Sequence, residues 1–358
     1  MKLRKIMATM LVIVMLLSAF SVSISAFTIV SLFPGEGYSN IVNNIYMAEM
    51  EFVDGVGPET DGIVIDYKYY SPVKADDTTK YPLVIWCHGS GNGLKTGSQL
   101  SASDVEAWAT EELQSRFKGT EGAFIFAPRS PENKGVYWGD KTIYPLKVVI
   151  DDFIAQHIDN IDLSRIYIGG YSLGGKMTLK MAVAYPEMFA AAFPICPAWV
   201  PDEAAAEKIA DMPIWLTSGK KDNVVNYKLM PKRAWKNIIS KSNLPEECRF
   251  STLTRTAEPD WSKTHSPHHA WISVNYDMFS SRDGDYPYMK TVDGNGNKIK
   301  LTYPNGMISW LSEKTSDYDG TITSGDRGNS EAYDNLFTME SLKKIVAYIE
   351  DVFAKIFN

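Results

Sequence analysis

The chain has few cysteines, few histidines and no excess of positive charge. Its 358 residues include 3 cysteines and 5 histidines, and 36 lysines and arginines stand against 43 aspartates and glutamates, for a formal net charge of −7. Three cysteines are too few for a disulfide scaffold and lack the paired spacing of a zinc site. An acidic chain also lacks the basic surface that neutralises phosphates, so we expect no nucleic-acid partner.

One long apolar run opens the chain. Met1–Lys5 is basic, Ile6–Phe20 is mostly apolar, and Ser21–Ala26 is small and weakly polar. This three-part pattern predicts a secretory signal peptide over residues 1–26. The alternative is an uncleaved membrane anchor, because apolar residues continue to Val30, but the run is short for a spanning helix. We therefore expect a secreted, extracellular protein with no stable membrane insertion after cleavage.

Apolar and aromatic residues are abundant in the rest of the chain. Hydrophobic residues make up 45% of the sequence and aromatic residues 12%, which excludes a disordered chain and allows a sizeable core. Short apolar runs alternate with helical patterns, which predicts an α/β fold with a mostly parallel, doubly wound sheet and helices on both faces. The predicted strands are 63–70, 83–87, 123–127, 165–169, 190–195, 214–217 and 249–253, and the predicted helices are 145–157 and 174–185.

Three regions fall outside this alternation. Residues 27–60 are an N-terminal lead-in to a catalytic domain predicted over 61–358. Residues 277–306 are an insertion that contains a predicted β-hairpin over a Gly/Asn turn, and we expect this hairpin to stand over the mouth of a substrate pocket. Residues 338–357 have one apolar stripe and predict an amphipathic C-terminal helix docked on the body of the protein.

The sequence Gly170-Tyr171-Ser172-Leu173-Gly174 lies between a predicted strand and a predicted helix. That context is what a nucleophile elbow requires, since the two glycines relieve crowding in a sharp turn and the serine hydroxyl is held exposed. Ser172 is therefore the candidate nucleophile. The alternative is a glycine-rich turn with an incidental serine.

A serine nucleophile needs a base, and the base needs an orienting acid. With an elbow of this kind the partners follow in the order serine, acid, histidine. Asp222 lies on the loop after the predicted strand 214–217 and is the candidate acid, although it could also be a solvated turn residue. The candidate bases are the histidines that come after Asp222, namely His265, His268 and His269. Such a cluster could also bind zinc, but no further ligand nearby completes a zinc site.

The developing oxyanion needs two backbone N–H donors. One is expected from Leu173, the residue after the nucleophile. The other is expected from Ser90, in the glycine-rich loop after the predicted strand 83–87. His88 opens that loop and is expected to brace it. The competing interpretation as a phosphate-binding loop fails because the following lysine and threonine come too late in the sequence.

Several of these segments together resemble one family. Residues 81–91, 164–175, 189–196 and 212–222 are similar to secreted α/β-hydrolase esterases of the carbohydrate-esterase, poly(hydroxybutyrate)-depolymerase-like and "predicted peptidase" group, which includes feruloyl and acetylxylan esterases. The resemblance covers about 61–271 and implies the α/β-hydrolase fold.

In this family the histidine commonly stands three residues before a tryptophan. His268 and Trp271 have that spacing, so the resemblance implies His268 as the base. Thr217-Ser218-Gly219 stands where the family usually has His-Gly before the acid. The insertion after the histidine makes transfer of substrate specificity unsafe.

The predicted function is that of a secreted serine carboxylesterase with the triad Ser172, Asp222 and His268, acting on acetyl or feruloyl esters of plant carbohydrate. The substrate class is implied by the resemblance, and an acylated polysaccharide would be the partner. No cofactor and no metal are expected. One alternative is a serine peptidase of the prolyl-oligopeptidase type, although the chain has no room for a large propeller. The other is a non-catalytic binding protein on the same fold, which an intact serine, aspartate and histidine set disfavours.

Overall fold

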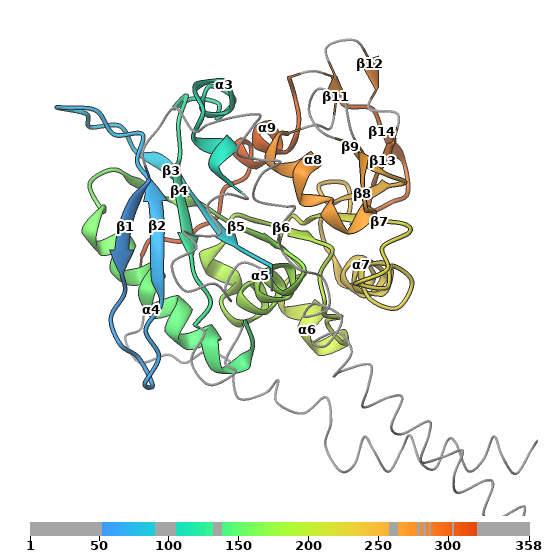
Figure 1. Ribbon diagram of the computed structural model, residues 1–358, viewed down its shortest axis with the longest axis horizontal. Helices are drawn as coiled ribbons and strands as arrows, with labels where there is room; N and C mark the ends of the chain where they lie inside the picture. The colour runs from blue at the N-terminus through green and yellow to red at the C-terminus, as the bar shows by residue number, and fades with distance from the viewer. Residues whose placement is uncertain are drawn as a thin grey trace, which may run out of the picture. The chain divides into compact units, whose positions relative to one another are not determined.

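A ten-stranded sheet forms the centre of the described part of the chain (Figure 1). The computed structural model describes residues 52–89, 105–131, 138–257, 264–277, 280–281, 284–285, 288–302 and 304–320. The strands of the sheet are β1 Val53–Val56, β2 Asp66–Tyr70, β3 Tyr81–Cys87, β4 Phe124–Pro128, β5 Ile161–Tyr171, β6 Ala191–Ile195, β7 Trp215–Gly219, β8 Arg249–Leu253, β13 Met289–Asp293 and β14 Lys298–Ile299. Two short pairs lie outside it, namely β9 Thr256–Ala257 with β10 Thr264–His265, and β11 Ser280–Ser281 with β12 Gly284–Asp285.

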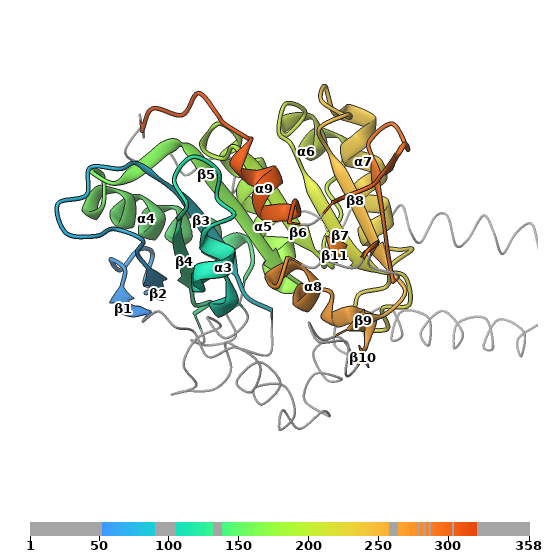
Figure 2. The ribbon, with the colours of Figure 1, turned by 90° about the horizontal axis from the view of Figure 1, so that it is seen from above.

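The strand order is β1-β2-β4-β3-β5-β6-β7-β8-β13-β14, and Figure 2 shows the strands from β1 to β8 following one another across the sheet. The pairs from β4 to β8 are parallel, whereas the pairs at both edges are antiparallel. All seven residues of β3 are buried, as expected for a central strand covered on both faces. The predicted mostly parallel, doubly wound sheet is confirmed.

Helices cover both faces of the sheet. Figure 1 shows α4 and α5 on one face and α3, α8 and α9 on the other. The helical segments are η2 Glu106–Ala109, α3 Glu111–Gln114, α4 Asp140–Gln156, α5 Leu173–Ala184, η4 Pro186–Met188, α6 Glu203–Lys208, α7 Pro231–Lys241, η5 Pro267–His269, α8 Trp271–Asn275 and α9 Met307–Ser312. No helix among the described residues has the length and apolar character needed to cross a membrane.

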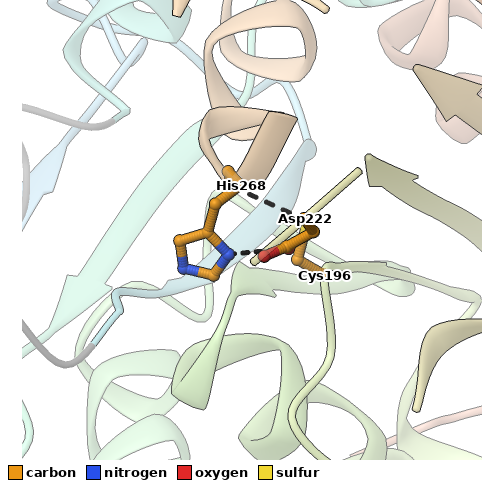
Figure 3. A group of neighbouring side chains, drawn as sticks. All are labelled: Cys196, Asp222 and His268. Atoms are coloured by element: carbon orange, nitrogen blue, oxygen red, sulfur yellow. Dashed lines mark hydrogen bonds and ion pairs between the residues drawn. The ribbon is translucent and has the colours of Figure 1, made fainter. Parts of the chain in front are cut away.

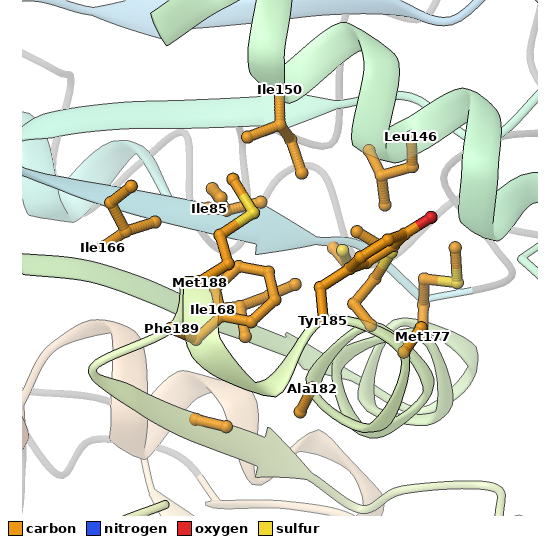
Figure 4. Packing of buried hydrophobic residues seen from close by; sticks show 14 of the residues in the cluster. Ile85, Leu146, Ile150, Ile166, Ile168, Met177, Ala182, Tyr185, Met188 and Phe189 are labelled. Carbon is orange, nitrogen blue, oxygen red and sulfur yellow. The ribbon is translucent and has the colours of Figure 1, made fainter. Parts of the chain in front are cut away.

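The main core lies between the sheet and helices α4 and α5. Ile85 of β3 and Ile168 of β5 point from the sheet toward Leu146 and Ile150 of α4 and Met177 of α5 (Figure 4). All five side chains are fully buried. Burying side chains of this size contributes roughly 1.5–3 kcal/mol each. The opposite face is also apolar, since Trp215 of β7 packs edge-on against Trp310 of α9 with ring centroids 5.4 Å apart.

Two elements differ from the sequence predictions. Helix α4 begins at Asp140 and contains Pro145, whereas the spacing of apolar residues predicted a helix from Pro145. Strand β1 lies within the predicted lead-in 27–60 and pairs with β2 at the edge of the sheet.

The hairpin β13–β14 forms as predicted, but it does not stand over the sheet as a cap. Strand β13 pairs with β8 and extends the central sheet, with Met289 beside Leu253 and Asp293 beside Arg249. Its turn therefore lies at the amino end of β8, away from the carboxyl ends of the parallel strands. The hydrogen bonds between β13 and β8 make this part of the insertion a strand of the central sheet, although its composition is typical of a loop. The predicted signal peptide 1–26 and C-terminal helix 338–357 lie outside the described residues.

Candidate active site

The strand order places two of the candidate segments next to each other. The chain passes from β3 to its neighbour β4 on one side, and β5 lies on the other side of β3. In open parallel sheets ligands bind at such a reversal, beyond the carboxyl ends of the strands. Cys87 at the end of β3 pairs with Gly170 near the end of β5, so His88 and Ser172 follow adjacent strand ends.

Ser172 lies on a sharp, strained turn between β5 and α5. Its φ is 59° and its ψ is −114°, a conformation that is rare for a residue with a side chain. The Ser172 N–H donates to Ile195 O at 2.8 Å, and the Ser172 carbonyl accepts from Ala198 N at 3.2 Å. These bonds join the turn to the segment around the end of β6. The strained backbone is what the elbow motif predicts.

The two glycines of the motif are required by close packing. A Cβ at Gly170 would lie 2.9 Å from the carbonyl carbon of Gly174, and a Cβ at Gly174 would lie 2.5 Å from His88 O. Leu173 is the first residue of α5, so its N–H has no partner one turn earlier in the helix. That N–H stands where the motif places an oxyanion donor. Ser90, the other candidate donor, lies outside the described residues.

Asp222 and His268 are joined by a short hydrogen bond at the carboxyl edge of the sheet. His268 Nδ1 and Asp222 Oδ2 are 2.7 Å apart, and both side chains are buried (Figure 3). The other carboxylate oxygen, Oδ1, accepts from Val224 N at 2.8 Å and from Val225 N at 2.9 Å. The bonds to Oδ1 therefore fix the carboxylate in its own loop, and the other oxygen, Oδ2, orients the imidazole of His268.

The turn that carries His268 packs directly on the end of β7. A Cβ at Gly219 would lie 2.6 Å from the carbonyl carbon of Pro267, so glycine is needed for this approach. On the other side, the ring of Tyr171 lies 5.6 Å from the ring of His268 and 6.1 Å from that of Trp271, centroid to centroid. Because Tyr171 directly precedes Ser172, these contacts bring the His268 turn to the elbow. They also give a physical reason for the His268–Trp271 spacing.

His88, directly after β3, is held neutral by burial. Burial lowers the pKa of His88 to about 4. Its Nε2 accepts from Ser130 N at 2.9 Å, which leaves the proton on Nδ1 to donate to Gly89 O at 2.6 Å. Both ring nitrogens are occupied, so His88 joins Gly89 after β3 to Ser130 after β4. Gly89 in turn lies against the Tyr171 ring, where a Cβ would approach Cζ to 2.7 Å.

His269 lies beside His268, and His265 lies beside His269. The ring of His269 is 6.2 Å from that of His268 and 6.2 Å from that of His265. Burial, together with the neighbouring histidines, lowers the pKa of His269 to about 4. A base of such low pKa would accept a proton from a serine hydroxyl with little driving force.

Cys196 is a member of the site that the sequence prediction missed. Its sulfur, an Asp222 oxygen and a His268 ring nitrogen lie within 4.8 Å of one another, a set of donor atoms that could hold a metal ion (Figure 3). However, burial and the Asp222 carboxylate raise the pKa of Cys196 well above its usual range, and a thiol binds metals as the thiolate. The available signal was its position directly after β6, which matches that of Ser172 after β5.

Comparison with known proteins finds similarity to esterases and related hydrolases. Residues 139–265 match the family model described as phospholipase/carboxylesterase, a stretch that includes Ser172 and Asp222. Poly(3-hydroxyalkanoate) depolymerase C of Paucimonas lemoignei is 46% identical over 126 aligned positions, and the match covers 32% of this chain and 27% of that protein. The crystal structure of a thermostable esterase is similar with a TM-score of 0.54 and 26% identity, covering 74% of this chain and 63% of that chain.

An acylaminoacyl peptidase of Pyrococcus horikoshii is also similar, with a TM-score of 0.46 and 15% identity over 68% of this chain and 43% of that chain. In each of these proteins the match spans less than two thirds of the relative's own length. The family match and the esterase structure support a place among esterases and related hydrolases. The chain has the α/β-hydrolase fold.

Proposed function

We propose that this protein is a secreted serine hydrolase that cleaves carboxylic esters through an acyl-enzyme. Ser172 is the nucleophile, His268 the general base, and Asp222 the residue that orients His268. The observation that carries the proposal is the 2.7 Å bond between His268 Nδ1 and Asp222 Oδ2, formed by a turn that packs beside the strained Ser172 elbow. The proposed export rests on the signal-peptide pattern of residues 1–26.

In the proposed mechanism each of these residues has one role in the reaction. The Asp222 bond keeps the His268 proton on Nδ1, so Nε2 is free to take the proton of the Ser172 hydroxyl as Oγ attacks the ester carbonyl. The carbonyl oxygen becomes negatively charged and is stabilised by the N–H of Leu173 and by that of Ser90. His268 then gives the proton to the leaving alcohol. A water molecule, deprotonated by His268, attacks the acyl-enzyme and releases the carboxylic acid.

The proposed substrates are acetyl or feruloyl esters on plant carbohydrate. This choice is supported by the resemblance of residues 81–91 and 164–175 to carbohydrate esterases and by the proposed export. The match to a poly(3-hydroxyalkanoate) depolymerase favours a second candidate, the ester bonds of a polyester. Both are insoluble or polymeric esters, and both would use the same triad.

A substrate panel tests the proposal. Purified protein and its Ser172→Ala variant are assayed on nitrophenyl acetate, methyl ferulate, acetylated xylan, a poly(3-hydroxybutyrate) film and a chromogenic peptide amide. We expect hydrolysis of nitrophenyl acetate and of acetylated xylan or methyl ferulate, and no turnover by Ser172→Ala. Release of hydroxybutyrate in place of these products would select the polyester. Faster cleavage of the peptide amide than of every ester would establish a peptidase, and a folded protein inactive on all substrates would establish a binding protein.

A further inference from the structure

Cys196 occupies a strained position at the end of β6. Its φ is 43°, in the left-handed region that residues with a side chain seldom adopt. The Cys196 N–H donates to Thr217 O of β7 at 2.8 Å, which fixes its backbone to the strand that leads to Asp222. The residue is fully buried. A non-glycine residue kept in this conformation in a buried site is held there by its surroundings and marks a candidate functional position.

The thiol of Cys196 contacts both members of the acid–base pair. Its Sγ donates to the main-chain carbonyl of His268 at 3.7 Å, within the range for a sulfur hydrogen bond (Figure 3). The sulfur also lies within 4.8 Å of the Asp222 carboxylate and of the His268 ring nitrogen. Cys196 therefore links three loops at the carboxyl edge, those that follow β6, β7 and β10.

The chemical state of the thiol suits a donor and excludes a nucleophile. Burial and the Asp222 carboxylate raise the pKa of Cys196 well above its usual range, so the sulfur keeps its proton. A protonated thiol is a weak hydrogen-bond donor and a poor nucleophile. Its proton can reach the carbonyl of His268, with the Asp222 carboxylate as a second acceptor.

We propose that Cys196 is a positioning residue, whose S–H bond to the His268 main chain holds His268 and Asp222 in the register that proton transfer with Ser172 requires. The inference rests on the proposed function for its effect on rate. Its effect on the His268–Asp222 bond is independent of that function. Catalytic groups tolerate little displacement, since a misplacement of about 1 Å costs roughly 100-fold in rate.

The test compares Cys196→Ala, Cys196→Ser and a control, Cys248→Ala. Cys248 is also a buried thiol, with its sulfur 4.0 Å from Met212 O and 3.7 Å from Ser242 Oγ. It directly precedes β8, so it lies at the amino ends of the parallel strands, whereas Cys196 lies at their carboxyl ends. For each protein kcat and KM on nitrophenyl acetate, the thermal midpoint, and the low-field proton resonance of the His268 Nδ1–H are measured.

We expect Cys196→Ala to lower kcat by about 10- to 100-fold with little change in KM, and to weaken or shift the low-field resonance. The hydroxyl of Cys196→Ser can donate to the same carbonyl, so this variant should recover part of the kcat and part of the low-field resonance. Cys248→Ala should lose thermal stability with kcat and the resonance unchanged. If Cys196→Ala does not fold, the test uses Cys196→Ser alone. Its hydroxyl should keep the low-field resonance of the His268 Nδ1–H at the wild-type position.

A Cys196→Ala protein with wild-type kcat and an unchanged resonance would overturn the inference. So would Cys196→Ser with the resonance absent. The resonance is recorded without substrate, so failure of the proposed esterase function, seen as wild-type protein inactive on every ester, is distinguishable from failure of the Cys196 assignment.

Discussion

Gly219 allows the end of β7 to contact the turn that carries His268, and replacing it tests how closely activity depends on that contact. In Gly219→Ala the new Cβ would lie 2.6 Å from the Pro267 carbonyl carbon and closer still to its oxygen. An ordinary van der Waals contact is 3.4 Å or more, so the Pro267 backbone must move by at least about 0.8 Å. His268 is the next residue and must move with it.

The expected cost follows from that displacement. A shift approaching 1 Å in the base predicts a fall in kcat of about 10- to 100-fold, because such a misplacement typically costs about two orders of magnitude. Overpacking should also lower the free energy of unfolding by about 1–3 kcal/mol. The assay is steady-state hydrolysis of nitrophenyl acetate, with urea unfolding measured on the same samples.

Gly294→Ala is the matched control. Its Cβ would lie 2.5 Å from the carbonyl oxygen of Pro245, so the same kind of clash arises with a proline carbonyl. Gly294 lies in the β13–β14 turn, at the amino end of β8 and far from the carboxyl edge. We expect a similar loss of stability with kcat unchanged. Equal kcat losses in the two variants, or a wild-type kcat in Gly219→Ala, would refute the reasoning.

Two further predictions concern the buried hydrogen-bonded groups. Asp222→Asn should keep the bonds from the loop N–H groups through its remaining oxygen but present an NH₂ to His268 Nδ1, which favours the wrong tautomer. We expect kcat to fall by about 10⁴-fold with the thermal midpoint nearly unchanged, and a loss of less than tenfold would contradict the orienting role. Burial lowers the pKa of His88 from 6.5 to about 4 in the folded protein, so the unfolded chain binds this proton first as pH falls. The shift makes the free energy of unfolding about 3 kcal/mol larger above pH 6.5 than below pH 4, and this difference is lost as pH falls from 6.5 toward 4. The His88→Gln variant should flatten this part of the curve of unfolding free energy against pH. An equal slope in the variant would assign the pH dependence to other groups.

The central strands and the elbow could be predicted from sequence because local rules determine them. Strands β3 and β6 are continuous apolar runs, and the glycines around Ser172 report a turn that no bulkier residue can make. The chain order of serine, acid and histidine then narrowed the partners to Asp222 and three histidines.

The parts that sequence did not predict depend on tertiary contacts. Choosing among the three histidines from residues alone was not possible, because the ring contacts of Tyr171 and the approach of Gly219 to Pro267 join distant segments. Cys196 could not be recognised as part of the site from the sequence, since its positive φ and its bond to His268 O appear only in the folded chain. The β13–β14 hairpin was predicted correctly as a hairpin, but its pairing with β8 required knowledge of the sheet edge.

The central claim is that Ser172 forms a covalent acyl-enzyme. A fluorophosphonate reacts with an activated serine and stops at the covalent adduct, so the reactive residue can be located by mass spectrometry of the intact protein and its peptides. The account predicts one adduct per chain, on the peptide that contains Ser172. Ser172→Ala should form no adduct, and Asp222→Asn should form the adduct at a greatly reduced rate. An adduct on another residue, or an unlabelled protein that still hydrolyses esters, would contradict the account.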